Sequence, residues 1–156
     1  MQSFKDKNGK NWDIELKIGT AIKLKSRFGL DVDQVLMPDD KSNTSAIEKI
    51  TTDIEYLFNI IYTFCEKQCR EAAISQEDFA ELFDAAAIDS AINAFLEEII
   101  NFSRPAKKKI LQEMNRIRKD VQKKAGEKVE KIISSQEFRD EIEKALTNSF
   151  LNVQES

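Results

Sequence analysis

Residues 3–18, SFKDKNGKNWDIELKI, carry the pattern that decides the fold class. Ser3-Phe4-Lys5 predicts a short strand, and Asp6-Lys7-Asn8-Gly9 contains Asn-Gly, a strong signal for a hairpin turn. Beyond the turn, apolar residues alternate with charged ones, which is the period of a half-buried strand. Because a lone hairpin is marginal in water, we expect its apolar face to pack on helices or to join another sheet. That face comprises Trp12, Ile14, Leu16 and Ile18.

The next segment carries signals for a short helix. Gly19 and Thr20 end the strand, and Thr20 is expected to cap a helix that reaches Phe28. Gly29 is a suitable left-handed terminator for that helix. Residues 30–36 fit either a third strand or a short helical turn, and periodicity leaves both open.

The remaining chain has helical spacing. A capping box at Ser45 and Glu48 predicts a helix whose apolar positions continue to Cys65. A weaker box at Ser75 and Asp78 predicts a short helix, and residues 88–100 predict another, which ends before a further helix opens at Pro105.

These patterns predict an α+β fold that is predominantly α-helical. An N-terminal β-hairpin, or three strands, packs on a three- to four-helix bundle, and a C-terminal helical extension follows. We expect residues 1–104 to form the hairpin and helical core, and residues 105–156 to form an extension that is first basic and then acidic.

The composition argues against several kinds of site. The chain has 156 residues and no histidine, which excludes imidazole catalysis and histidine-ligated metals. Cys65 and Cys69 are expected to be two reduced, buried thiols on one helix face, and not metal ligands or a disulfide. The acidic residues Asp31, Asp33 and Asp39-Asp40 lack the spacing of a calcium-binding EF-hand loop. We therefore expect no metal, no cofactor and no enzymatic activity.

No apolar run has the length of a membrane span, and the N-terminal residues lack the apolar core of a secretory signal. We therefore expect a protein that does not enter a membrane.

Residues 104–128 are the most unusual part of the sequence. They hold ten Lys or Arg against three Asp or Glu, although the whole chain has a net charge of −4. Their apolar residues follow a narrow heptad-like stripe, which is typical of a helix that meets a partner. The stripe lapses at Lys124 and Gly126, and Ser134 with Glu137 predicts a fresh helix start. The candidate partner-binding residues are the apolar Ile110, Met114, Ile117 and Val121 and the basic Lys107, Lys108, Arg116, Arg118 and Lys119.

Two other interpretations of this segment stay open. The basic residues could contact nucleic-acid phosphates, but the segment has no aromatic residue for base stacking and the chain as a whole is acidic. The segment could also be a further helix of the same bundle.

Short motifs follow one another in a definite order along residues 3–105. An F-x-D-x-x-G-x-x-W hairpin precedes L-x-I-G-T-A, which starts at Leu16, and F-G-L-D, which starts at Phe28. I-I-Y-x-F-C starts at Ile60, S-x-E-D-F at Ser75, and A-I-D-x-A-x-x-A-F-L-E-E-I-I-x-F at Ala87. This order resembles small phage and prophage proteins of the tail assembly chaperone family. The longer, basic tail after residue 105 departs from that family.

The resemblance implies a non-enzymatic helper in the cytoplasm of the bacterial host. Such a protein binds the tape measure protein or tail-tube subunits before the tail polymerises, and it is absent from the finished virion. The resemblance assigns no functional residue, and it leaves open whether the chain forms a homo-oligomer. The alternatives are a nucleic-acid-binding accessory protein that uses the basic helix, and a structural tail or connector component of the virion.

Overall fold

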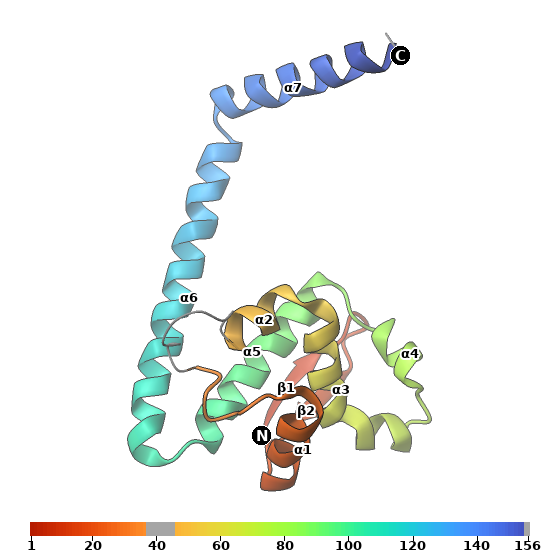
Figure 1. Ribbon diagram of the computed structural model, residues 1–156, viewed down its shortest axis with the longest axis vertical. Helices are drawn as coiled ribbons and strands as arrows, with labels where there is room; N and C mark the ends of the chain where they lie inside the picture. Colours follow the sequence, from red (N-terminus) through yellow and green to blue (C-terminus); the bar gives the residue numbers. More distant parts are fainter. Residues whose placement is uncertain (37–45, 155–156) are drawn as a thin grey trace. The chain divides into compact units, whose positions relative to one another are not determined.

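The computed structural model describes residues 1–36 and 46–154, and its contacts divide the chain into two compact units (Figure 1). Unit 1 is Met1–Met114 and unit 2 is Asn115–Ser156. The described residues form an antiparallel hairpin followed by helices, so the predicted α+β, predominantly helical fold is confirmed. The division falls inside the helix that starts at Pro105, whereas the sequence placed it at residues 104–105.

The hairpin consists of β1 (Gln2–Lys5) and β2 (Asn11–Ile14), which pair antiparallel with Phe4 opposite Trp12. Both of these side chains are buried, as is that of Ile14. The alternation in the sequence therefore predicted correctly which side chains of the hairpin face the core.

Asp6 organises the hairpin turn. Its Oδ1 accepts hydrogen bonds from the backbone N–H groups of Asn8 (2.9 Å) and Lys10 (3.0 Å). Its Oδ2 accepts a hydrogen bond from Nε1 of the buried Trp12 (2.9 Å). Burial alone would raise the pKa of Asp6, but these three hydrogen bonds outweigh it and lower the pKa below its usual value. Gly9 has a φ of 83°, so the turn uses the left-handed conformation that glycine tolerates.

β2 ends earlier than the sequence predicted. Leu16 is buried, but Ile18 is 71% exposed and begins α1 (Ile18–Phe28). The predicted strand position of Ile18 is therefore wrong, because the chain leaves the extended conformation after Lys17, the N-cap residue. The predicted cap at Thr20 is also wrong, since this residue already lies inside the helix.

α1 ends at Gly29, which has a φ of 67°, as the sequence predicted. Residues 30–36 then form turns, and the described chain has no strand here. Four apolar side chains of this segment are buried and join the core: Leu30, Val32, Val35 and Leu36.

The helix predicted from Ser45 to Cys65 is two helices. α2 (Ala46–Thr52) and α3 (Ile54–Glu71) are separated by Asp53, whose side chain accepts a hydrogen bond from Tyr56 N–H (2.9 Å) and so caps α3. Uninterrupted apolar spacing hid this break. Ser45 lies outside the described residues, so its predicted capping box is not placed.

α4 (Gln76–Ala80) and α5 (Ala85–Phe102) follow as predicted. Ser75 caps α4 by accepting a hydrogen bond from Asp78 N–H (3.0 Å), which confirms the second cap. The side chain of Asp84 caps α5 in the same way through Ala87 N–H (2.8 Å).

The core of unit 1 lies between the hairpin and the helices. Phe79 of α4 packs edge-on against Trp12, with ring centroids 4.7 Å apart, and against Phe83 at 5.1 Å. Phe58 of α3 joins the same aromatic cluster, at 5.9 Å from Phe79 and 5.8 Å from Phe83. The hairpin face therefore packs on helices, as predicted.

Two side chains tie the hairpin to the long helices, with β1 contacting α5 and β2 contacting α3. The amide of Gln68 on α3 accepts from the backbone N–H of Asp13 (3.0 Å) and donates to its carbonyl (2.8 Å). The buried Glu98 on α5 accepts a hydrogen bond from Leu16 N–H (2.9 Å), and its other oxygen lies 3.0 Å from the α-amino group of Met1.

α6 (Pro105–Ile133) and α7 (Gln136–Gln154) form the rest of the chain. Pro105 opens α6 as predicted, and α6 continues through Gly126, where the apolar stripe lapses. One glycine costs a helix only about 1 kcal/mol, which a long helix tolerates. The fresh start predicted at Ser134 lies one residue later, where Ser135 Oγ accepts a hydrogen bond from Phe138 N–H (3.3 Å).

Candidate partner-binding surface

The first part of α6 belongs to the core of unit 1. Leu111 is 2% exposed and Met114 packs against the core, whereas Ile110 is 60% exposed. Lys107 Nζ donates to the carbonyl oxygen of Asp33 and lies 3.4 Å from its carboxylate. The proposed seam is therefore divided, with Met114 turned to the core and Ile110 turned to solvent.

The second part of α6 presents apolar side chains to solvent. Ile117 and Val121, four residues apart on one helix face, are 51% and 60% exposed. The neighbouring polar residues bond along the helix: Arg118 donates to Asn115 and Gln122 (3.1 Å each), and Arg116 pairs with Asp120 (3.6 Å).

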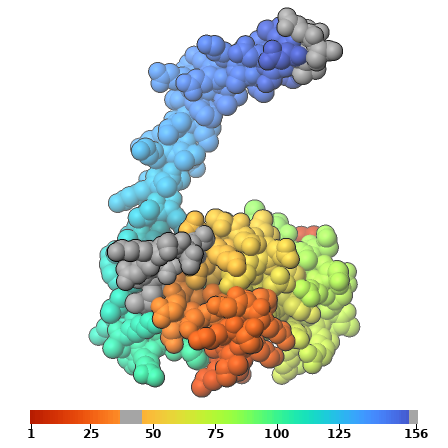
Figure 2. Space-filling view, viewed as in Figure 1, coloured from red at the N-terminus to blue at the C-terminus, as the bar shows by residue number. Residues whose placement is uncertain are grey.

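The exposed apolar residues continue beyond the predicted seam. No hydrophobic side chain described between residues 115 and 152 is buried. Figure 2 draws the residues of α7 in darker blue. We call this set of residues the arm stripe: Ile117, Val121, Val129, Ile132, Ile133, Ile142, Leu146, Phe150 and Leu151, each about half exposed or more.

Unit 2 thus has no hydrophobic core among its described residues. Most helical stability in proteins comes from packing an apolar face against other elements. A regular apolar stripe on unpacked helices is the pattern of a surface that is completed by another molecule.

The predicted site residues therefore separate into two groups. Lys107 and Met114 contact other residues of unit 1, and Lys108 is half-buried. The exposed members are Ile110, Ile117, Val121, Arg116 and Lys119, with Arg118 half-buried. The heptad-like stripe did not indicate that one face of the first part of α6 packs on the core of unit 1. The spacing of Leu111 and Met114, three residues apart, is the signal that would have revealed it.

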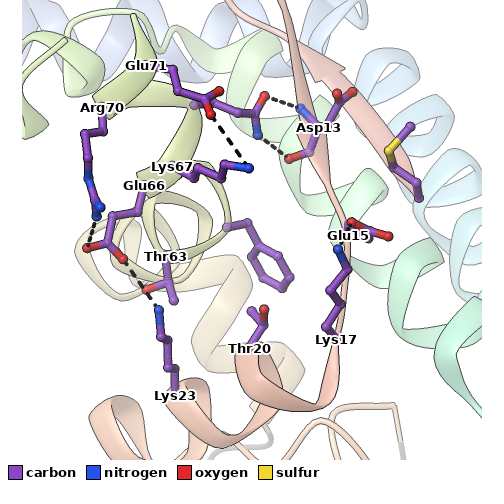
Figure 3. A pocket seen from close by; sticks show the side chains of 13 residues that line it. Asp13, Glu15, Lys17, Thr20, Lys23, Thr63, Glu66, Lys67, Arg70 and Glu71 are labelled. Carbon is purple, nitrogen blue, oxygen red and sulfur yellow. Dashed lines mark hydrogen bonds and ion pairs between the residues drawn. The ribbon is translucent and has the colours of Figure 1, made fainter. Parts of the chain in front are cut away.

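A polar pocket of about 560 Å³ lies between β2, α1 and α3 (Figure 3). Its charged side chains pair with one another: Glu66 lies 3.6 Å from Arg70 and 3.9 Å from Lys23, and Lys67 lies 3.7 Å from Glu71. These mutual pairs leave little unbalanced charge to select a ligand.

The residues weighed for metal or redox chemistry have structural partners. Asp31 bonds Lys25 (2.9 Å), and this hydrogen bond lowers the pKa of Asp31. Within the described ranges, no group of three or more His, Cys, Asp or Glu side chains is placed to hold a metal. Cys65 and Cys69 are buried free thiols, and burial raises the pKa of both, which disfavours the reactive thiolate. Asp39-Asp40 lies outside the described residues.

Along the described chain, no helix combines the length and apolarity needed to cross a membrane. The arm stripe lies on helices that also carry many charged residues. No protein-family model, curated protein or solved structure matches the chain.

Proposed function

We propose that this protein is a non-enzymatic helper that binds an amphipathic helix of a partner protein on the arm stripe. The observation that carries the proposal is the absence of any buried hydrophobic side chain among the described residues 115–152, although the helices there carry regularly spaced apolar residues.

The energetics favour a protein partner. Full burial of an Ile, Leu or Val side chain stabilises by about 1.5–3 kcal/mol, so covering a half-exposed one contributes about 1 kcal/mol. Several such contacts help to offset the entropic cost of association. The surrounding lysines and arginines then set the orientation and rate of association more than the affinity.

The motif order in residues 3–105 supports a specific role, that of a phage or prophage tail assembly chaperone in the bacterial cytoplasm. Its partner is then the tape measure protein or a tail-tube subunit. In that role the arm stripe shields the client until assembly begins.

The test is a binding titration of the full chain against tape measure fragments and tail-tube subunits. Ile117→Ser with Val121→Ser should weaken binding by about tenfold or more, because each removes a central apolar contact. Ile22→Ser is the matched control, since Ile22 on α1 is 63% exposed but lies in unit 1. Hydrogen exchange of residues 115–152 should slow when the client binds. Unchanged binding by the double variant would refute the arm stripe as the client site.

Nucleic-acid binding is the second candidate, and the excess of positive charge in residues 104–128 favours it. Phosphate binding through five charges predicts a log–log salt dependence with a slope of about −3.5 to −4.5, whereas an apolar contact responds little to salt. If the protein binds nucleic acid through these basic residues, Lys119→Glu with Lys123→Glu should abolish DNA binding. Salt-sensitive DNA binding that survives Ile117→Ser but not the charge reversals would replace the chaperone proposal.

A further inference from the structure

A second apolar surface lies on unit 1, separate from the arm stripe. It is a groove of about 440 Å³ between α3, the end of α4 and the start of α5, within the volume range of about 300–1,000 Å³ that is typical of ligand pockets. We call it the α3–α5 groove. Its apolar walls include Ile54, Phe58, Ile61, Ala80, Phe83 and Ile88.

One wall of the groove is a row along α3. Ile54, Phe58 and Ile61 follow the i, i+4, i+7 spacing of one helix face. Ile61, at the inner end of the row, is fully buried, so a partner contacts the outer part, Ile54 and Phe58, which spans about 6 Å or one helical turn. Ile54 is 66% exposed, so the row extends beyond the core into solvent.

The floor of the groove is preorganised. The rings of Phe58 and Phe83 are held by each other at 5.8 Å and by the fully buried Phe79 at 5.9 and 5.1 Å. A bound side chain therefore meets aromatic surfaces that are already fixed, which reduces the ordering cost of binding.

The border of the groove is acidic. Glu55 lines it, and Asp53, Glu81 and Asp84 are the chain neighbours of other lining residues. All four are exposed, and Asp53 and Asp84 cap helices. The nearby cations are Lys7, whose backbone N–H donates to the carbonyl of Leu82 (3.0 Å), and Lys49, whose carbonyl accepts from Asp53 N–H (2.9 Å). The local balance of these groups is negative.

We propose that the α3–α5 groove binds a basic amphipathic helix of a partner protein, with apolar anchors at i, i+4 and i+7 on the aromatic floor and lysines or arginines facing the acidic border. The apolar lining from α3 on one side and from Ala80, Phe83 and Ile88 on the other accepts the apolar face of a helix, and the acidic border favours a basic one. This site is independent of the arm stripe.

The experiment measures binding of two synthetic 18-residue helical peptides to the full chain by fluorescence anisotropy. Both carry leucine at i, i+4, i+7 and i+11; one has lysine and the other glutamate at the flanking positions. We expect saturable one-to-one binding of the lysine peptide and at least about tenfold weaker binding of the glutamate peptide.

Variants locate the site. Ala80→Trp fills the groove from an exposed position and should weaken binding of the lysine peptide by about tenfold or more. Glu55→Lys should weaken it several-fold, with a smaller effect at high salt, whereas Glu71→Lys, the same charge change at the other end of α3, should not. Circular dichroism checks that each variant is folded.

Three outcomes would overturn the proposal: equal binding of the two peptides, no effect of Ala80→Trp, or self-association of the chain that Ala80→Trp abolishes, which would make a second copy the occupant. Ile117→Ser with Val121→Ser should leave peptide binding unchanged. Failure of this inference is thus distinguishable from failure of the proposed function.

Discussion

Replacement of Asp6 by alanine tests how the hairpin is held together. The variant removes the acceptor for three hydrogen bonds. Asn8 and Lys10 are exposed, so water replaces the lost acceptor for their N–H groups. Trp12 is 0% exposed, so its indole N–H stays buried without a partner.

The expected cost follows from this difference. An unsatisfied buried donor costs about 1–3 kcal/mol, and a hydrogen bond to a charged group contributes about 1.5–3 kcal/mol. Because solvent replaces the two backbone bonds, we expect Asp6→Ala to lower the free energy of unfolding by about 2–4 kcal/mol. Asp13→Ala removes an exposed carboxylate from β2 and should cost less than about 0.5 kcal/mol.

The assay is urea unfolding followed by near-ultraviolet circular dichroism. The single tryptophan and both tyrosines lie in unit 1, so the tryptophan and tyrosine bands of this spectrum follow that unit alone. In a Trp12→Phe background no indole N–H is left unpaired, so Asp6→Ala should cost about 1–3 kcal/mol less there. A cost below about 0.5 kcal/mol for Asp6→Ala, or no coupling to Trp12→Phe, would refute the reasoning.

The pH dependence has a definite sign. Because the folded state lowers the pKa of Asp6, the carboxylate stabilises the fold above the unfolded pKa of about 3.9, and this contribution is lost as pH falls through the folded value. The stability difference between the wild type and Asp6→Asn should therefore be full at neutral pH and shrink below about pH 4. A difference that grows on acidification would contradict the lowered pKa.

Leu16→Ala should cost about 2–5 kcal/mol of unfolding free energy, because Leu16 is buried, whereas Ile18→Ala should cost less than about 0.5 kcal/mol; equal losses would show that β2 faces another way. Cys65 and Cys69 should react slowly with a thiol reagent at pH 8 in the folded protein and rapidly in urea, because burial raises the pKa of both thiols; fast labelling of both in the folded protein would contradict it. Gly126→Ala should stabilise α6 by about 0.5–1 kcal/mol, since Gly126 has ordinary helical geometry and open space beside it; thermal melts by far-ultraviolet circular dichroism would show a fall if it served a packing role.

Local patterns in the sequence identified much of the fold. The Asn-Gly turn and the alternation up to Leu16 predicted the hairpin, and Gly29, Ser75 and Pro105 predicted helix ends, because each acts on the backbone next to it. The break between α2 and α3 at Asp53 was not predicted, because apolar spacing continues across it. The cap is an aspartate within a run of helix-compatible residues.

The candidate sites required the tertiary structure. The stripe on α6 was visible in the sequence, but Leu111 and Met114 face unit 1 while Ile117 and Val121 do not, and only the packing of the other elements decides which face is covered. The α3–α5 groove joins residues from three helices far apart in the chain, so no local pattern marks it.

The contact between Gln68 and Asp13 has a consequence for solubility. A two-stranded sheet exposes backbone N–H and C=O groups along its outer edges, and such an edge is a template on which the strand of another molecule can pair and seed aggregation. At Asp13 both backbone groups that point away from β1 are taken by one glutamine amide, which imitates the peptide group of a third strand. At this point of β2, further strand addition is blocked by a helix side chain, without the prolines, bulges or inward charges that other proteins place at their sheet edges.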